Sequence, residues 1–210
     1  MDPVDQLVIY IKALREKGLF NISETIDGQY NHMGATLADA ALQANNHYKT
    51  TVKPRVQKIL KKYPDAKRTS DMIKIVKTVE DAKTFLDWKG GERAKRFLEL
   101  LTLFENERVE CESNLKDWLS IPKNQAWLQT IYGIGPKTVD YLQILAGTST
   151  NAIDRHLLRF LEKAGIRTKN NYQEAHDIIN KAAEKLDIDP AHFDHSIWTY
   201  MSEGSGHECS

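Results

Sequence analysis

The sequence predicts an all-α protein. Apolar residues recur at helical spacing along most of the 210 residues, and no run alternates between apolar and polar residues as a strand would. Capping residues, prolines and glycines separate the apolar runs at positions typical of helix starts and stops. The chain shows no internal repeat of about 20–50 residues, and its length suits one large domain or two small ones.

The expected helices follow one another with short loops. The first begins at Pro3, carries Leu7, Ile11 and Leu14 on one face and stops at Gly18. Ser113 is expected to cap a helix over 114–119. The other helices are expected over 34–44, 49–63, 72–79, 80–88, 92–104, 124–132, 136–146, 155–164, 172–186 and 193–201.

Composition excludes several classes of protein. The 29 Lys and Arg balance 29 Asp and Glu, so a protein that coats nucleic acid through bulk charge is disfavoured. The two cysteines, Cys111 and Cys209, exclude a disulfide framework and any four-cysteine zinc or iron–sulphur site within the chain. They suit a reducing, intracellular setting. We expect no membrane helix, because no apolar run approaches about 18 residues, and no secretory signal in the acidic segment 1–5.

Positive charge is nonetheless concentrated in one stretch. Residues 49–62 contain six basic residues and no acidic one. Such a stretch is either a solvated helix face or a wall that meets phosphates, and the sequence leaves both open. The six are Lys49, Lys53, Arg55, Lys58, Lys61 and Lys62.

Residues 128–140 predict two helices joined by a tight hairpin. Gly133 and Gly135 flank Ile134, and Pro136 suits the first position of the second helix. Glycines let the backbone approach another molecule closely, and the start of the second helix favours an anion such as a DNA phosphate. Ile134 is expected to point inward. An ordinary helical hairpin with a glycine turn is the alternative.

Lys137 lies in the first turn of that second helix. A cation there opposes the helix dipole at a cost of roughly 0.3–1 kcal/mol, which a surface lysine tolerates. The same field favours the neutral amine, and a neutral lysine amine is a nucleophile that forms Schiff bases.

An aspartate is expected to return toward that lysine. The helix over 136–146 carries the chain about 15 Å away, and the seven residues 147–153 reach over roughly 20 Å. They deliver Asp154, a natural N-cap for the following helix. A carboxylate held near an amine also stabilises a developing positive charge or takes part in proton transfer.

Residues 131–138 and 152–156 together resemble the helix-hairpin-helix DNA glycosylase superfamily, most of all its endonuclease III-like branch. That family joins a Gly-X-Gly hairpin to a lysine two residues on and a distant aspartate, here Lys137 and Asp154. Looser likeness is found at 42–45, 91–95 and 195–198. The resemblance covers about 34–201 and is specific over 128–160.

The resemblance implies a two-lobed helical glycosylase fold with DNA in a cleft between the lobes. Residues 31–146 would form a central lobe that ends in the hairpin, and 1–30 with 147–203 the second lobe, leaving 204–210 as a flexible tail. The partner would be double-stranded DNA that contains a damaged or mismatched base or an abasic site. The damaged nucleotide would be flipped out of the stack. We expect a monomer located in the cytoplasm or nucleoid.

The resemblance also implies roles for individual residues. Lys137 would attack the sugar C1′, expel the base and nick the strand by β-elimination through a Schiff base, and Asp154 would support the positive charge. Gly133, Ile134 and Gly135 would bind a phosphate.

The resemblance suggests three further roles, and two of them have an alternative. Backbone carbonyls of Gln129, Ile131 and Ile134 are candidates for an ion shared with DNA. His156 would contact a phosphate, or is simply a histidine at a helix start. Gln43 would fill the gap left by the flipped base, or is a surface glutamine at a helix end.

The chain departs from the endonuclease III-like pattern after its last helix. Four cysteines commonly hold an iron–sulphur cluster there, whereas this chain offers only His207 and Cys209, too few for a metal site. We therefore expect no iron–sulphur cluster and no other cofactor. Tyr132 and Pro136 replace residues more common in that branch, so the excised base stays open. Polar or aromatic candidates for the base pocket are Tyr30, His32, Asn45, Asn46, His47 and Tyr48.

Four functions remain in competition. A lysine at 137 favours a bifunctional glycosylase and abasic-site lyase over a monofunctional glycosylase. A non-catalytic hairpin module that binds DNA has no need of Lys137 paired with Asp154. An all-α interaction domain without nucleic acid is the fourth.

Overall fold

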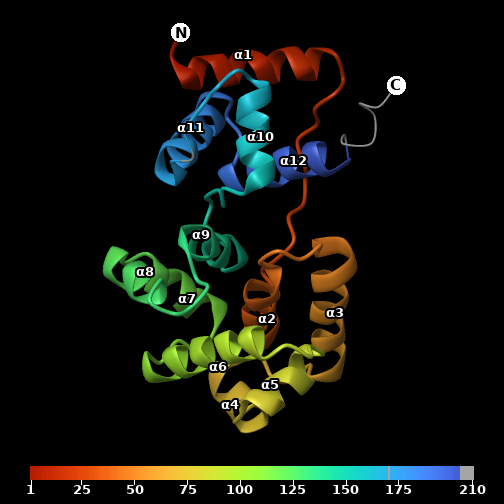
Figure 1. Ribbon diagram of the computed structural model, residues 1–210, viewed down its shortest axis with the longest axis vertical. Helices are drawn as coiled ribbons and strands as arrows, with labels where there is room; N and C mark the ends of the chain where they lie inside the picture. Colours follow the sequence, from red (N-terminus) through yellow and green to blue (C-terminus); the bar gives the residue numbers. More distant parts are fainter. Residues whose placement is uncertain (170, 204–210) are drawn as a thin grey trace. The chain divides into compact units, whose positions relative to one another are not determined.

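The computed structural model describes residues 1–169 and 171–203, and within these ranges the chain is helical with no strand (Figure 1). The predicted all-α class is confirmed. The segment 204–210, expected to be a flexible tail, lies outside the described residues. The α-helices are α1 (Pro3–Glu16), α2 (Met33–Gln43), α3 (Lys53–Lys62), α4 (Thr69–Ile75), α5 (Val79–Leu86), α6 (Gly91–Asn106), α7 (Glu112–Leu119), α8 (Pro122–Leu128), α9 (Pro136–Leu145), α10 (Arg155–Lys163), α11 (Tyr172–Lys185) and α12 (Pro190–Glu203), with a π-helical turn, η1 (Tyr48–Val52), before α3.

The chain divides into two compact units. Unit 2 is the continuous segment 28–148, and unit 1 combines residues 1–27 with 149–210. Unit 2 closes on itself, because the N–H of Gln29 near its start donates to Leu145 O near its end at 3.0 Å.

Unit 2 is built around α2. Every residue from Met33 to Leu42 is buried, because α2 packs against α3, α4, α6 and α9 on different sides. Phe97 of α6 is fully buried and stacks on Phe85 of α5, with ring centroids 5.3 Å apart. This core fixes α9, the helix that carries Lys137.

Unit 1 has a separate aromatic core. Phe20 packs on Phe160 of α10 and Phe193 of α12, with ring centroids 5.7 and 6.4 Å apart. Helix α1 packs against α11, and α10 against α12. This core fixes the start of α10, where Asp154 lies.

Several helix ends differ from the predictions. The expected helix over 49–63 begins with η1, and that over 72–79 ends at Ile75, because Thr78 caps α5 through a capping box with Asp81. Cys111, not Ser113, is the N-cap of α7. The helix expected over 124–132 starts at Pro122 and ends at Leu128, where bonds between residues three apart begin.

In the described part of the chain, no helix is both long and apolar enough to span a bilayer.

Candidate functional site

The predicted hairpin lies in unit 2 between α8 and α9. Gly133 has a φ of +81°, and the N–H of Ile134 donates to Ile131 O at 3.0 Å. Ile134 is 4% exposed, which confirms its inward position. Gly135 is the extended N-cap of α9, and a Cβ added to it would meet no atom within 4 Å. The backbone at Gly135 is therefore open to close approach by another molecule.

A buried arginine that the sequence analysis missed holds this hairpin. Arg96 of α6 is 8% exposed and donates from Nε to Tyr132 O at 3.0 Å and from Nη1 to Ala41 O at 3.4 Å. Burial and the nearby charge of Arg93 lower the pKa of Arg96. A Cβ at Gly133 would lie 1.8 Å from Arg96 Nη2, so glycine at this position makes room for the guanidinium.

Lys137 is the second residue of α9 and is partly exposed. The first turn of α9 contains no acidic residue. The structure therefore places a lysine beside the glycine hairpin, at the positive end of a helix dipole, as predicted.

Asp154 is the N-cap of α10. One oxygen, Oδ1, accepts from the N–H of His156 at 2.7 Å and of Leu157 at 3.1 Å, so the predicted capping role is confirmed. The ring of His156 lies edge-on to Trp198 of α12, with centroids 6.2 Å apart. This aromatic contact agrees with the alternative that His156 is simply a histidine at a helix start. A contact between His156 and a DNA phosphate stays a prediction.

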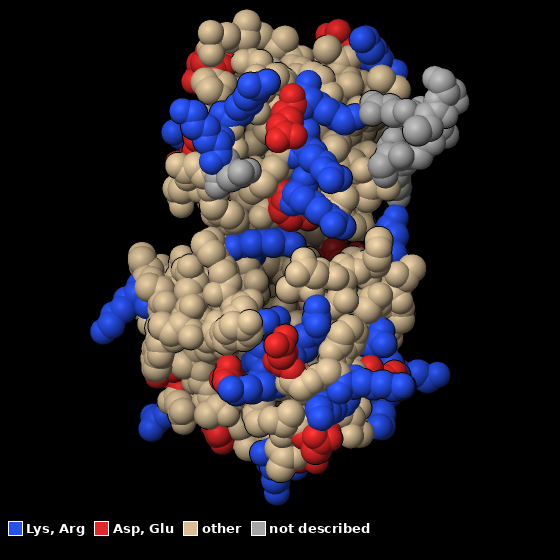
Figure 2. Space-filling model, in the orientation of Figure 1, with Lys and Arg blue, Asp and Glu red and all other residues tan. Residues whose placement is uncertain are grey.

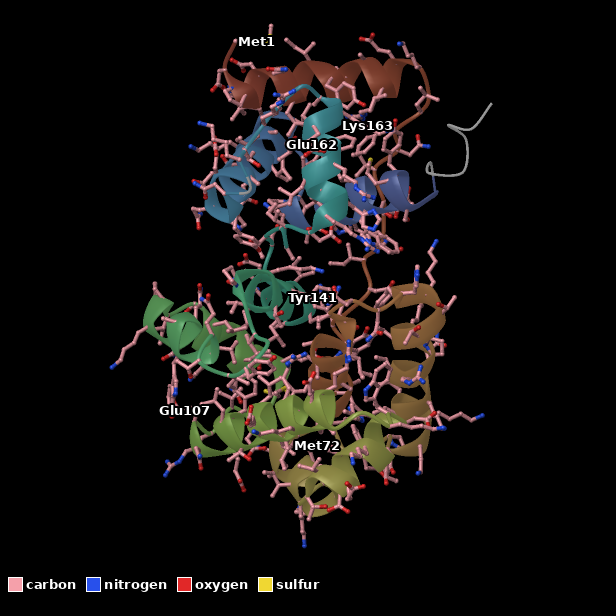
Figure 3. All side chains as sticks on the ribbon, in the orientation of Figure 1. Met1, Met72, Glu107, Tyr141, Glu162 and Lys163 are labelled. Carbon is pink, nitrogen blue, oxygen red and sulfur yellow. The ribbon has the colours of Figure 1, made fainter. Side chains whose placement is uncertain are left out.

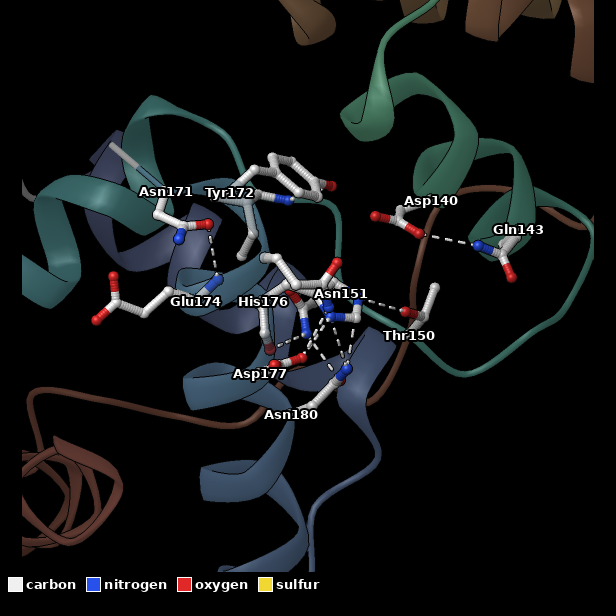
Figure 4. Close-up of polar contacts among 12 residues, drawn as sticks. Asp140, Gln143, Thr150, Asn151, Asn171, Tyr172, Glu174, His176, Asp177 and Asn180 are labelled. Carbon is white, nitrogen blue, oxygen red and sulfur yellow. Dashed lines mark hydrogen bonds and ion pairs between the residues drawn. The ribbon is translucent and has the colours of Figure 1, made fainter. Parts of the chain in front are cut away.

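The loop that leads to Asp154 is held by a polar cluster in unit 1 (Figure 4). Asn151 is fully buried and donates to Asn180 Oδ1 at 2.7 Å, while Thr150 Oγ1 lies 3.1 Å from His176 Nε2. The Asp154 backbone is therefore fixed on both sides, by this cluster and by α10. Lys137 belongs to unit 2, and Asp154 belongs to unit 1.

Gln43 is the last residue of α2 and is partly exposed. Its segment is tied to the start of α6, because Arg93 donates from Nη2 to Ala44 O at 2.7 Å. The guanidinium of Arg93 also lies 4.9 Å from the ring of Trp88, and that of Arg55 lies 5.2 Å from it. An aromatic ring with two cations therefore adjoins the Gln43 segment.

The basic stretch 49–62 lies on η1 and α3. Basic side chains, with acidic ones among them, gather where α3 lies in the space-filling view (Figure 2). Lys58 forms an ion pair with Asp87 at 2.8 Å, and Lys62 lies over the Tyr63 ring. Lys61 and Lys62 are exposed on the last turn of α3. These contacts are compatible with a solvated helix face and with a surface that meets phosphates.

Four residues of unit 2 form a second cluster that the sequence analysis did not assemble. Asp39 of α2 is fully buried and accepts from Tyr30 OH at 2.6 Å and from Tyr141 OH at 2.9 Å. The hydroxyls of Tyr30 and Tyr48 lie 3.3 Å apart. Burial and the Asp39 charge raise the pKa of Tyr30 and of Tyr141 well above their ordinary values. Tyr141, labelled in Figure 3, comes from α9, as does Lys137.

Two other residues proposed for a base pocket, His32 and Asn46, have structural roles. His32 is the buried N-cap of α2, accepting from the N–H of Ala35 and contacting Tyr63 O at 2.7 Å. Asn46 donates to Leu42 O. Tyr30 and Tyr48 are the two that the Asp39 cluster brings together.

No metal site is visible in the described ranges. They contain no group of three or more His, Cys, Asp or Glu side chains arranged to hold a metal ion. His207 and Cys209 lie outside those ranges. An ion on the carbonyls of Gln129, Ile131 and Ile134 remains a prediction, as does the absence of an iron–sulphur cluster or other cofactor.

Three solved structures share this fold, and all are helical DNA glycosylases. The 3-methyladenine DNA glycosylase of H. pylori bound to 1,N6-ethenoadenine has a TM-score of 0.67, 18% identity and full coverage of both chains. The 8-oxoguanine DNA glycosylase of Thermotoga maritima has a TM-score of 0.59 and 18% identity over 93% of this chain and 96% of its own. That of Methanocaldococcus jannaschii has a TM-score of 0.57 and 19% identity over 96% and 87%.

The chain thus has the same helical fold as these DNA glycosylases of known structure, as its motifs predicted. It belongs to the family defined by a domain of unknown function, DUF8548, whose model matches residues 9–202. No curated protein is significantly similar in sequence.

Proposed function

We propose that this protein is a base-excision repair DNA glycosylase that also cleaves the strand as an abasic-site lyase. The observation that carries the proposal is the position of Lys137 next to the glycine hairpin. Lys137 lies two residues after Gly135, where the backbone has space for a phosphate to approach. The fold shared with DNA glycosylases of known structure supports the same class of reaction.

The reaction uses Lys137 as nucleophile. The amine of Lys137 forms a bond to C1′ of a flipped nucleotide as the C1′–N bond breaks, and the base leaves with the bonding electrons and takes a proton. The attached nitrogen then loses one proton, and the C1′–O4′ bond breaks as O4′ takes up a proton, which opens the sugar ring to a protonated Schiff base. Loss of a C2′ proton then expels the 3′ phosphate by β-elimination.

Asp154 supports the positive charge that develops on the sugar. One of its oxygens is engaged by two backbone N–H groups, which fixes the carboxylate in direction. A preoriented carboxylate stabilises a developing cation without reorganisation. For this reaction both Lys137 and Asp154 must reach one nucleotide in the complex with DNA.

Borohydride trapping tests the proposal. The protein is incubated with a duplex that carries a single abasic site, and borohydride reduces any Schiff base to a stable amine. We expect a covalent adduct with the wild type and none with Lys137→Ala, while Lys123→Ala, on the exposed face of α8, serves as control and retains the adduct.

The outcomes separate the competing functions. DNA binding without an adduct, together with base release from damaged duplexes, would show a monofunctional glycosylase. Binding with neither reaction would show a non-catalytic module. If the protein binds neither damaged nor intact duplex, the remaining hypothesis is an interaction domain that does not bind nucleic acid.

A further inference from the structure

The loop that leads to Asp154 takes its hydrogen-bond acceptors from side chains. Residues 149–153 lie in neither a helix nor a strand, and Ala152 and Ile153 are 5% and 4% exposed. Within the described ranges, no N–H group of this loop donates to a backbone carbonyl. Buried backbone N–H groups need acceptors, so the side chains that supply them determine the path of the loop.

Two side chains supply acceptors directly before Asp154. Asp194 Oδ2 accepts from the N–H of Ala152 at 2.7 Å, and Tyr172 OH accepts from the N–H of Ile153 at 3.3 Å. Tyr172, labelled in Figure 4, belongs to α11, and Asp194 belongs to α12. The bond to Asp194 is shorter and its acceptor is a carboxylate, so it is the stronger of the two.

We propose that Asp194 is a positioning residue for Asp154. By fixing the backbone two residues before Asp154, it sets the direction in which the Asp154 carboxylate meets the sugar, and Tyr172 supports the same segment more weakly. This inference rests on the proposed function, because it concerns the carboxylate that supports the positive charge when Lys137 attacks.

Helix α12 is a firm support for this contact. Phe193 and Ile197, which flank Asp194 on α12, are fully buried in the core of unit 1. The same helix packs against α10, where the ring of Trp198 contacts that of His156. Helix α12 therefore holds Asp154 from both sides, through the loop before it and through the helix that it caps.

A change at Ala152 is passed to Asp154 because only Ile153 separates them. Without the Asp194 carboxylate, the buried N–H of Ala152 has lost an acceptor, and the loop must move to reach another acceptor or water. A displacement of about 1 Å in a catalytic group lowers a rate by up to about 100-fold. A small movement of the loop is therefore enough to weaken the reaction while the helices stay folded.

A double-mutant cycle separates positioning from general stability. The rate constant of borohydride trapping is measured with excess protein at saturating concentrations of a duplex that carries a preformed abasic site. Asp194→Ala should lower this rate constant about tenfold and change the Kd for the duplex by less than about twofold. In the Asp154→Asn background the same substitution should lower the rate by less than about twofold, because no carboxylate charge remains to be directed.

Conservative variants test whether the hydrogen bond is the means. Asp194→Asn keeps a side-chain oxygen that accepts from Ala152, so it should retain at least about half of the wild-type rate. Tyr172→Phe removes the longer, neutral bond to Ile153 and should cost about threefold.

Asp2→Ala is the matched control in unit 1. Asp2 caps α1 by accepting from the N–H of Asp5, so its removal also takes away one carboxylate and one bond to the backbone. The rate constant of trapping should stay unchanged in this variant.

Hydrogen exchange gives a readout that needs no activity. Asp194→Ala should speed amide exchange at Ala152 and also at His156 and Leu157, because both donate to Asp154 and their bonds loosen when the loop moves. Asp2→Ala should change none of the three amides.

Three results would overturn the inference. These are an equal loss of rate in both backgrounds, an Asp194→Asn variant as slow as Asp194→Ala, and unchanged exchange at His156 and Leu157 in Asp194→Ala. Failure of the proposed function appears separately, as a wild type that forms no borohydride adduct whatever the exchange rates are.

Discussion

Asp154 caps α10 and, in the proposed reaction, supports the positive charge on the sugar, and a substitution can separate these two roles. Asparagine caps helices as well as aspartate does, so Asp154→Asn should change the free energy of unfolding by less than about 0.5 kcal/mol. It removes the charge, so trapping and excision should fall about 100-fold. Asp154→Ala should lose the same activity and about 1 kcal/mol of stability. Urea unfolding and single-turnover kinetics measure both; full activity in the asparagine variant would mean that Asp154 is only a cap.

Gly133 is required by both its backbone and its neighbour. Gly133→Ala places a Cβ 1.8 Å from Arg96 Nη2 at a φ of +81°. The clash should displace the buried guanidinium from its two carbonyl acceptors and lower the free energy of unfolding by about 2–3 kcal/mol. Gly135→Ala, at a φ of −113° with open space around it, is the control and should cost less than about 1 kcal/mol in urea unfolding. Equal losses would contradict the role given to Arg96.

At the scale of helices, apolar periodicity predicted where most elements lie and local chemistry decided where they end. The helix predicted over 72–79 was too long at its C-terminal end, because Ile75, Val76 and Val79 continue the apolar pattern. In the structure the capping box at Thr78 starts a new helix. The hairpin and the cap at Asp154 were predictable because their geometry depends on residues close in sequence.

The Asp39 cluster was not predictable in this way. Tyr30 and Tyr141 are 111 positions apart in sequence, and only the packing of α9 on α2 brings them to one carboxylate. Arg96 likewise meets Gly133 across a tertiary contact. The available signal was Asp39 among the mostly apolar residues of α2. An aspartate in such a run indicates a buried carboxylate that needs hydrogen-bond partners.

The end of α3 allows the two readings of the basic stretch to be separated. If this helix meets phosphates, Lys61→Gln with Lys62→Gln should weaken DNA binding and reduce the slope of log affinity against log salt by about 1–2. Lys74→Gln with Lys83→Gln removes the same charge from lysines paired with Asp71 and Glu80, and should leave the slope unchanged. If the salt slope of DNA binding is the same in the wild type and in both double variants, the basic residues at the end of α3 form a solvated face and do not contact phosphates.

For the whole molecule, the buried tyrosines predict a loss of stability at high pH. Their raised pKa means that the folded state keeps both phenolic protons, while the unfolded chain releases them above about pH 10. Stability from this source is complete below that pH and falls as pH rises, by about 1.4 kcal/mol per pH unit for each tyrosine. Urea unfolding of the wild type and Tyr141→Phe across this range measures the difference, and parallel curves would refute it.

The division into units predicts which part of the chain folds alone. Segment 28–148 contains its own core, and the bond from Gln29 to Leu145 closes its ends, so the isolated segment should unfold cooperatively and keep its helical circular dichroism. Unit 1 draws on two segments, and 149–210 without α1 and Phe20 should lack a stable core. The isolated 28–148 segment holds Lys137 and the hairpin but not Asp154. It should therefore bind duplex DNA and form the borohydride adduct at least about 100-fold more slowly than the full chain. An adduct at the full rate would place all the chemistry in unit 2 and remove Asp154 from the mechanism.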